Sequence, residues 1–232
     1  MASLPINNPQ RILQALDSNL ERQTRVVLFG RAALAMGFGE VGAQFGNTQD
    51  VDAILPTVEM SKIEADSQFW NAIELTNRSL EPSGLYVSHL FTDKQIAITS
   101  DWLDRIVAIP SEGYRFLRLF RPSAADLILT KMMRNDREDL DDIRFIMSQE
   151  RVSEAELHAA FLKSVKLEIP ELQSIFAAMQ PIVVQLAREI EMSREPNTAS
   201  RPQRSWDPNW WAELTKQTPH EKGIEKDRGI EI

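Results

Sequence analysis

Two six-residue runs of mainly apolar residues constrain the fold of this chain most. The first, RVVLFG at residues 25–30, ends in glycine and is followed by RAALAMG, which has the composition of a helix. The second, DVDAIL at residues 50–55, stops at Pro56, which cannot donate to a strand ladder. Short apolar runs bounded by turn residues are typical of buried strands. The order of strand, glycine turn, helix and strand predicts an α/β front half.

The rest of the chain adds helix starts and more strands. We expect helices to begin at Asn8 (with Pro9 next), at Ser61 (towards Arg78), at Ser123 (through Met133), at Asp139, at Ser153 and at Pro170 (to about Glu191). We expect strands at residues 86–91, 95–99, 105–109 and 114–120. The predicted class is α/β (α+β), a mixed sheet with flanking helices followed by a helical C-terminal half.

Composition changes after Met192, where SREPNTASRPQRSWDPN offers little to a core. We therefore divide the chain into an α/β core at 1–122, a helical subdomain at 123–192 and a linker and polar tail at 193–232. Within the tail, Asp207 and Pro208 begin a pattern that predicts a short helix bearing tryptophans. That helix either docks on the parent domain or binds a partner.

Composition excludes several classes of protein. The chain has 232 residues with 26 Lys+Arg against 34 Asp+Glu, a formal charge of −8 that argues against coating nucleic acid with the whole surface. It has no cysteine, which removes disulfides, thiol nucleophiles and cysteine metal sites. No apolar run approaches the roughly 18 residues that a membrane span needs. We expect a cytoplasmic protein with no membrane partner.

Asp50 and Asp52 stand at the start of a predicted strand whose other members are apolar. Side chains at i and i+2 of a strand project from the same face, so both carboxylates can enter one space. Two carboxylates and substrate phosphates are a common ligand set for Mg²⁺, and Mn²⁺ accepts the same oxygen donors. The alternative is an ordinary solvated turn at a strand entry.

Gly30 and Lys131 strengthen the first interpretation. Gly30 lets the chain pass close to a ligand and precedes a helix N-terminus, where phosphate binds readily, although it also suits a plain tight turn. Lys131 lies on the apolar helix DLILTKMM. If that helix continued unbroken, Asp142 would fall about 20° from Lys131 around the axis. Lys131 and Asp142 would then either line one site or belong to a helix face with salt bridges along it.

Together, these segments resemble the nucleotidyltransferase superfamily, in particular the minimal nucleotidyltransferases related to abortive-infection and toxin–antitoxin toxins. The matching segments are LFGRAAL, TQDVDAIL and DLILTKMMRNDREDLDDI, within residues 26–146. The resemblance implies that Asp50 and Asp52 bind the metal and that Gly30 and Arg31 border a nucleoside triphosphate. It further implies that Lys131 approaches the phosphates, and that Asp139 and Asp142 complete a second motif.

The chain departs from that pattern at two points. Arg31 replaces the small second residue of the usual Gly-Gly or Gly-Ser pair, and the loop from there to Asp50 is longer than usual. A third carboxylate on an adjacent strand has no match, and the acids that could supply it are Asp93, Asp101 and Asp104. Two functions follow as alternatives: a catalytic nucleotidyltransferase, or an inactive nucleotidyltransferase-like scaffold that binds a protein partner.

The implied reaction moves a nucleoside monophosphate from the triphosphate to an acceptor hydroxyl and releases pyrophosphate. The resemblance points to an RNA acceptor such as transfer RNA, or to a protein, and to an antitoxin as partner. Basic residues concentrate at Arg115, Arg118, Arg121, Lys131, Arg134 and Arg137. They either contact an RNA end or, in YRFLRLF, face solvent from an edge strand. The scattered residues His89, His158 and His220 are expected to be ordinary core or surface histidines.

Overall fold

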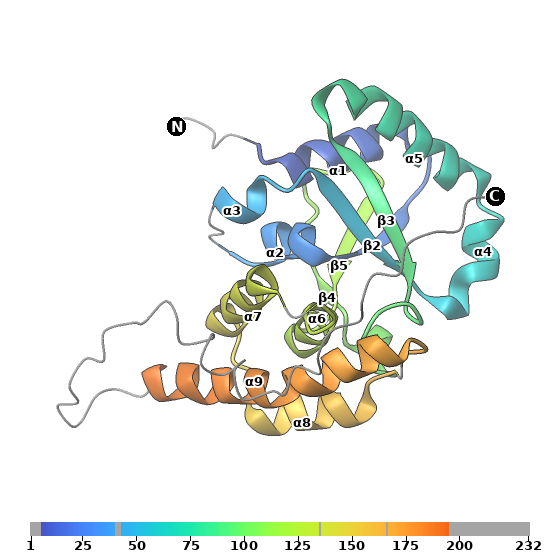
Figure 1. Ribbon diagram of the computed structural model, residues 1–232. Coiled ribbons are helices and arrows are strands. Elements are labelled where there is room, and N and C mark those ends of the chain that lie inside the picture. Colours follow the sequence, from blue (N-terminus) through green and yellow to red (C-terminus); the bar gives the residue numbers. More distant parts are fainter. Residues whose placement is uncertain (1–5, 40–42, 135, 166, 195–232) are drawn as a thin grey trace, which may run out of the picture. The chain divides into compact units, whose positions relative to one another are not determined.

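The computed structural model describes residues 6–39, 43–134, 136–165 and 167–194 (Figure 1). In this part of the chain one mixed sheet is built from β1 (Thr24–Phe29), β2 (Asp50–Leu55), β3 (Tyr86–Thr92), β4 (Val107–Ala108) and β5 (Leu117–Arg121). The strand order is β3-β2-β1-β5-β4. β1 is antiparallel to β2 and parallel to β5, and β2 is parallel to β3. The end of β1 therefore meets the start of β2, with Phe29 opposite Asp52.

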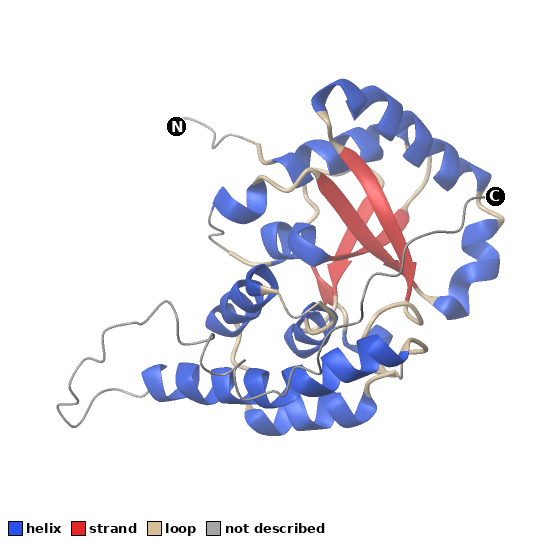
Figure 2. Cartoon of the chain, in the orientation of Figure 1, coloured by secondary structure: helices blue, strands red, loops and turns tan. Residues whose placement is uncertain are grey.

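Helices flank this sheet and make up the back half of the described chain (Figure 2). Before the last strand the α-helices are α1 (Asn8–Asn19), α2 (Gly30–Gly37), α3 (Ala43–Gly46), α4 (Met60–Glu64) and α5 (Ser67–Leu80). After it they are α6 (Ala124–Lys131), α7 (Arg137–Gln149), α8 (Glu154–Lys163) and α9 (Pro170–Arg194). Short 3-10 turns lie at Thr57–Glu59, Glu81–Ser83 and Trp102–Arg105.

The core is divided between the two faces of the sheet. Val51 and Ala53 of β2 point into the large cluster formed with α1, α5 and the C-terminal helices. Ile54 points to the other face, into a small cluster around Ile98 and Trp102. Strand alternation thus places the even-numbered residues of β2, Asp50 and Asp52 included, away from the main core. The expected mixed α/β fold is confirmed.

Several sequence predictions of strands need adjustment. The prediction for 50–55 is exact, and that for 25–30 is one residue late. Residues 95–99 are not a strand, apart from an isolated bridge between Thr99 and Ser164. The amides of Ala97 and Thr99 bond to side chains, with Thr99 N donating to Asp126 Oδ1 at 3.1 Å. The predicted strand 105–109 shrinks to Val107–Ala108. β5 lies between β1 and β4, so it is not an edge strand.

Helix starts differ from expectation by a few residues, for local reasons. Asn7, not Asn8, caps α1, because its side chain accepts from Gln10 N at 2.8 Å. The helix predicted from Ser61 is broken: α4 ends at Glu64, and Asp66 caps a new helix by accepting from Phe69 N at 3.0 Å. The capping box at Ser153 is present as predicted.

Two predictions concern the end of the chain and the membrane. The tryptophan-bearing helix expected after Asp207 lies outside the described residues. Among the helices that are described, none is both long and apolar enough to cross a membrane. The described residues up to Arg194 form one compact unit.

Candidate nucleotide and metal site

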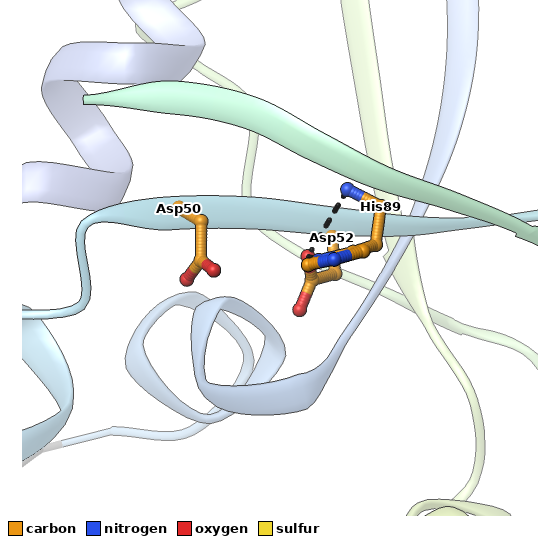
Figure 3. Close-up of side chains that lie close together, drawn as sticks. All are labelled: Asp50, Asp52 and His89. Atoms are coloured by element: carbon orange, nitrogen blue, oxygen red, sulfur yellow. Dashed lines mark hydrogen bonds and ion pairs between the residues drawn. The ribbon is translucent and has the colours of Figure 1, made fainter. Parts of the chain in front are cut away.

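Asp50 and Asp52 project from the same side of β2 toward the start of α2, as Figure 3 shows. Asp50 Oδ1 accepts a hydrogen bond from Thr48 Oγ1 at 2.7 Å. Asp52 Oδ1 accepts from Ser88 Oγ at 3.0 Å and from the backbone N–H of residue 89 at 3.3 Å. Both residues are partly exposed, and within the described chain neither forms an ion pair with lysine or arginine. The pair is hydrogen-bonded but not neutralised by a permanent cation.

Gly30, the first residue of α2, lies against Asp52. Its φ is +63°, in the left-handed region that favours glycine. A Cβ built there would lie 3.1 Å from Asp52 Oδ2. No side chain caps the start of α2, so its first amides remain available to a ligand. The positive φ favours glycine at this position, and a side chain there would crowd Asp52. That Gly30 borders a nucleoside triphosphate stays a prediction.

His89 is the residue beside Asp52 that the sequence did not lead us to expect there. β3 pairs with β2 through a register shift, so that Val51 faces Val87 while Ala53 faces Leu90. Asp52 is therefore opposite both Ser88 and His89, and the imidazole reaches the carboxylate, with Nδ1 3.0 Å from Asp52 Oδ1. Strict alternation would have placed His89 on the other face. A bulge of this kind has no clear signature in one sequence, which explains the omission.

The donor set fits a divalent cation. Asp50, Asp52 and His89 each offer a ligand atom, and these atoms all lie within 4.8 Å of one another. Carboxylate oxygens and imidazole nitrogen are both common ligands of divalent metals. It is the one group of three or more such side chains that the described residues contain.

The expected third carboxylate is not at this site. Asp93 accepts hydrogen bonds from Thr57 and, at 3.2 Å, from Trp102 Nε1. Asp101 binds the ammonium of Lys163 at 2.7 Å, and this hydrogen bond, against the opposing effect of burial, lowers the pKa of Asp101 to about 2. Neither these acids nor Asp104 joins the group around Asp52. The side chain that reaches Asp52 from the adjacent strand β3 is His89.

Lys131, Asp139 and Asp142 form a second, buried cluster. Lys131 Nζ lies 3.2 Å from Asp139 Oδ1 and 2.5 Å from Asp142 Oδ2, and all three side chains are less than a tenth exposed. The sequence placed Lys131 and Asp142 on one face of a continuous helix; in the structure they are in contact, but across two helices. α6 ends at Lys131 and α7 begins at Arg137, so the contact joins two packed helices. In the described part of the chain, the ion pairs of Lys131 are made to these two acids and not to Asp50 or Asp52.

Arg31 links the two clusters. It follows Gly30 directly, and its guanidinium lies 3.1 Å from Glu138 Oε2 and 3.5 Å from Asp142 Oδ2. Its side chain is 34% exposed, so it faces solvent on one side and the acids of α7 on the other. The large residue at this position therefore turns away from Asp52 and is held by α7.

The two buried aspartates are affected differently by their surroundings. Burial, the largest influence, opposes ionisation of Asp139, but the hydrogen bond from Arg134 and the charges of Arg134 and Lys131 outweigh it and lower its pKa. Arg134 binds Asp139 through Nε and a terminal nitrogen, each at 2.9 Å. Burial prevails at Asp142 and raises its pKa, against the opposing charges of Lys131 and Arg31.

The basic residues between 115 and 137 do not form one patch. Arg121 is buried and paired with Glu150, and Lys131 is buried as described above. Arg118 lies opposite Arg25 near the start of β1, at the other end of that strand from Gly30. Arg134 and Arg137 are exposed at the start of α7, on the side of the second cluster.

A mixed sheet with an acid pair on β2 beside a glycine-initiated helix defines a nucleotidyltransferase-like α+β protein. The family described as nucleotidyltransferase of unknown function (DUF6036) matches residues 9–176, and the chain belongs to that family. This confirms the superfamily to which the sequence motifs pointed. No curated protein and no solved structure matches the chain.

Proposed function

We propose that this protein is a metal-dependent nucleotidyltransferase that moves a nucleoside monophosphate from a nucleoside triphosphate to an acceptor hydroxyl. The observation that carries the proposal is the pair Asp50 and Asp52 on one side of β2, which no lysine or arginine of the described residues neutralises and which lies beside Gly30. Two neighbouring carboxylates repel each other, and a divalent ion between them relieves that repulsion. Family membership is consistent with this use of the site.

Asp50 and Asp52 would hold Mg²⁺ or Mn²⁺ together with the triphosphate. When bound, such an ion stabilises negative charge on phosphate oxygens and lowers the pKa of a coordinated hydroxyl. Gly30 allows the phosphates to approach the chain, and the first amides of α2 donate to their oxygens. The acceptor hydroxyl loses its proton to solvent and its oxygen bonds to the α-phosphorus. The bond from that phosphorus to the oxygen that bridges it to the β-phosphate breaks, and pyrophosphate leaves.

Arg31 would offset charge on the departing pyrophosphate, because its guanidinium is partly exposed one residue after Gly30. Lys131 would act through it: its ammonium holds Asp142, which in turn contacts Arg31 Nε at 3.5 Å. In this proposal Lys131 and Asp139 are positioning residues, while Asp50, Asp52 and Arg31 face the nucleotide.

Label transfer tests the proposal directly. The protein is incubated with each of the four α-labelled triphosphates, a divalent metal and total cellular RNA, and labelled RNA or protein is then sought. The variant Asp50→Ala with Asp52→Ala should lose transfer while keeping the fold, as judged by circular dichroism. Asp104→Ala, which changes an exposed acid outside the site, is the matched control. Equal transfer by the double variant would refute the proposal.

A non-catalytic binding role is the second candidate, and one observation favours it. The resemblance implies that Lys131 approaches the phosphates, but in the structure its ammonium is bound by the buried carboxylates of Asp139 and Asp142. A folded protein that shows no metal-dependent nucleotide binding, but retains a partner through residues after 193, would support this role.

A toxin role, with an RNA acceptor and an antitoxin partner, follows from the resemblance of the motifs. Expression of the wild-type chain in a bacterial host should arrest growth, and expression of the double variant should not. Co-expression of the neighbouring reading frame should restore growth. Growth unaffected by the wild-type chain at a confirmed expression level would argue against a toxin.

A further inference from the structure

We infer that His89 is the third ligand of the metal site, and that its nitrogen makes the site select Mn²⁺ over Mg²⁺. The inference rests on the proposed function, because it assumes that Asp50 and Asp52 hold a divalent ion. It adds a ligand of a different chemical type and a preference among metals.

The first argument is the bulge in β3. Val87 and Leu90 face Val51 and Ala53, so two residues of β3 stand opposite Asp52 alone. Regular pairing would have turned the side chain of residue 89 away from Asp52. The extra residue directs it onto the carboxylate, and bulges beside sites commonly redirect a side chain in this way.

The second argument is how the ring is held. Its Nδ1 lies 3.0 Å from Asp52 Oδ1 and 3.1 Å from Ser88 Oγ, while Ser88 Oγ donates to the same carboxylate oxygen. The ring also stacks on Phe91, with centroids 5.4 Å apart and planes inclined by 4°. An imidazole that is 58% exposed is thus fixed in one orientation by three neighbours.

The third argument is the spacing of the donors. Two neighbouring ligands of one ion, each at about 2.1 Å and at right angles, lie about 3 Å apart. The observed 3.0 Å between His89 Nδ1 and Asp52 Oδ1 equals that separation. The ligand atoms of Asp50, Asp52 and His89 all lie within 4.8 Å of one another. Little rearrangement is needed for all three to bind one ion.

Donor chemistry gives the metal preference. Many superfamily members carry a third carboxylate on an adjacent strand, and such an all-oxygen set suits Mg²⁺. Imidazole binds first-row transition ions better than Mg²⁺, whereas the two carboxylates also accept Mn²⁺. Replacing a carboxylate by imidazole also removes one negative charge from the site. A set of two carboxylates and one imidazole therefore favours Mn²⁺.

Metal binding by the full chain tests this without any activity assay. Free Mn²⁺ is titrated by electron paramagnetic resonance, and Mg²⁺ is added to measure competition, with the wild type, His89→Ala and His89→Asp. The ratio of the Mg²⁺ to the Mn²⁺ dissociation constant should fall at least about 10-fold in His89→Ala, since even groups that only support a ligand change metal affinity 10- to 100-fold. His89→Asp should restore Mg²⁺ binding. His158→Ala, also at a 58% exposed histidine, is the matched control.

Pulsed resonance gives the decisive signature. Directly bound imidazole should produce ¹⁴N modulation of the Mn²⁺ signal in the wild type and in His158→Ala, but not in His89→Ala. Mn²⁺ bound by the wild type without that modulation would overturn the inference and leave the proposed function intact. Mn²⁺ bound equally well by the Asp50→Ala, Asp52→Ala variant would overturn both, as would a wild type that binds no Mn²⁺.

Discussion

The molecule holds two pairs of aspartates that look alike in the sequence and differ in their surroundings. Asp50 and Asp52 on β2 are partly exposed, with 20% of the Asp52 side chain accessible, and they meet no protein cation in the described chain. Asp139 and Asp142 on α7 are 2% and 3% exposed and are bound by Lys131. Burying a carboxylate is expensive unless a cation accompanies it. The buried pair is therefore held by the protein's own cations, and the open pair remains available for an external one.

The largest expected effect comes from removing the shared cation of the buried pair. Lys131→Met leaves Asp139 and Asp142 without their common partner, and removing one member of a buried pair typically costs about 3–5 kcal/mol of unfolding free energy. Urea denaturation measures this loss. Lys163→Met, which removes a lysine paired with the more exposed Asp101, should cost less than about 1 kcal/mol. Equal losses in the two variants would show that the buried cluster does not depend on Lys131.

The open pair should show the reverse behaviour. Asp50→Asn with Asp52→Asn should change the stability of the free protein by less than about 1 kcal/mol, because surface changes are usually small. Ligand at about 100 times its dissociation constant stabilises a native protein by about 2.7 kcal/mol, and the variant should lose that gain with metal and triphosphate. Thermal melts with and without both ligands measure it. A melting shift that survives in the variant would place the ligand elsewhere.

Gly30 tests the contact between α2 and the open pair. Gly30→Ala carries the strain of a positive φ, about 1–2 kcal/mol, and places a Cβ 3.1 Å from Asp52 Oδ2. Gly84 has nearly the same φ, +64°, and nothing within 4 Å of an added Cβ, so Gly84→Ala carries the strain alone. The two variants should be similarly destabilised, but only Gly30→Ala should lose the ligand-induced melting shift. The same loss in Gly84→Ala would remove any special role for Gly30.

The smallest expected effect is on the pH dependence of the unfolding free energy in acid. It distinguishes Asp139 from Asp142. The folded pKa of Asp139 is lowered, so its contribution is present above its unfolded value of about 3.9 and is lost as pH falls through the folded pKa. The folded pKa of Asp142 is raised, so ionised Asp142 costs stability, and that cost is relieved as pH falls through its folded pKa.

Stability measured between about pH 5 and pH 3 should therefore fall less steeply in Asp139→Asn than in the wild type, and more steeply in Asp142→Asn. Carboxyl ¹³C titration should place the two aspartates on opposite sides of about 3.9. Identical slopes in both variants would contradict the assignment of opposite shifts.

The sequence was sufficient to predict features that depend on local patterns. Strand alternation and turn residues predict where β2 begins and ends. They also predict that a glycine turn follows β1 and that Asp50 and Asp52 share one side of β2. Spacing placed Lys131 and Asp142 on one face of a continuous helix, where they would lie about 16.5 Å apart along the axis. The structure has two helices instead, and their packing brings the two side chains into contact.

The rest could not be predicted because it depends on tertiary structure. Residues 95–99 have strand-like composition, yet Asp126 and Met133 of the helical part bind their amides. His89 reaches Asp52 only because one residue is added to β3. A single sequence does not show that a side chain from another element will bind an amide in place of a neighbouring strand. It also does not show where a strand gains an extra residue.

Residues 30 and 31 are adjacent in the sequence but lie next to different pairs of aspartates. This limits how the chain can be divided into fragments. Gly30 lies against Asp52, while Arg31 reaches α7. A fragment truncated at residue 122 would keep Asp50 and Asp52 but would remove both acids that bind Arg31. The excised helices would carry an acid cluster that lacks the guanidinium of Arg31. Expression of either half alone is thus a poor route to an active fragment, and complementation of the two halves in one cell would be the more informative experiment.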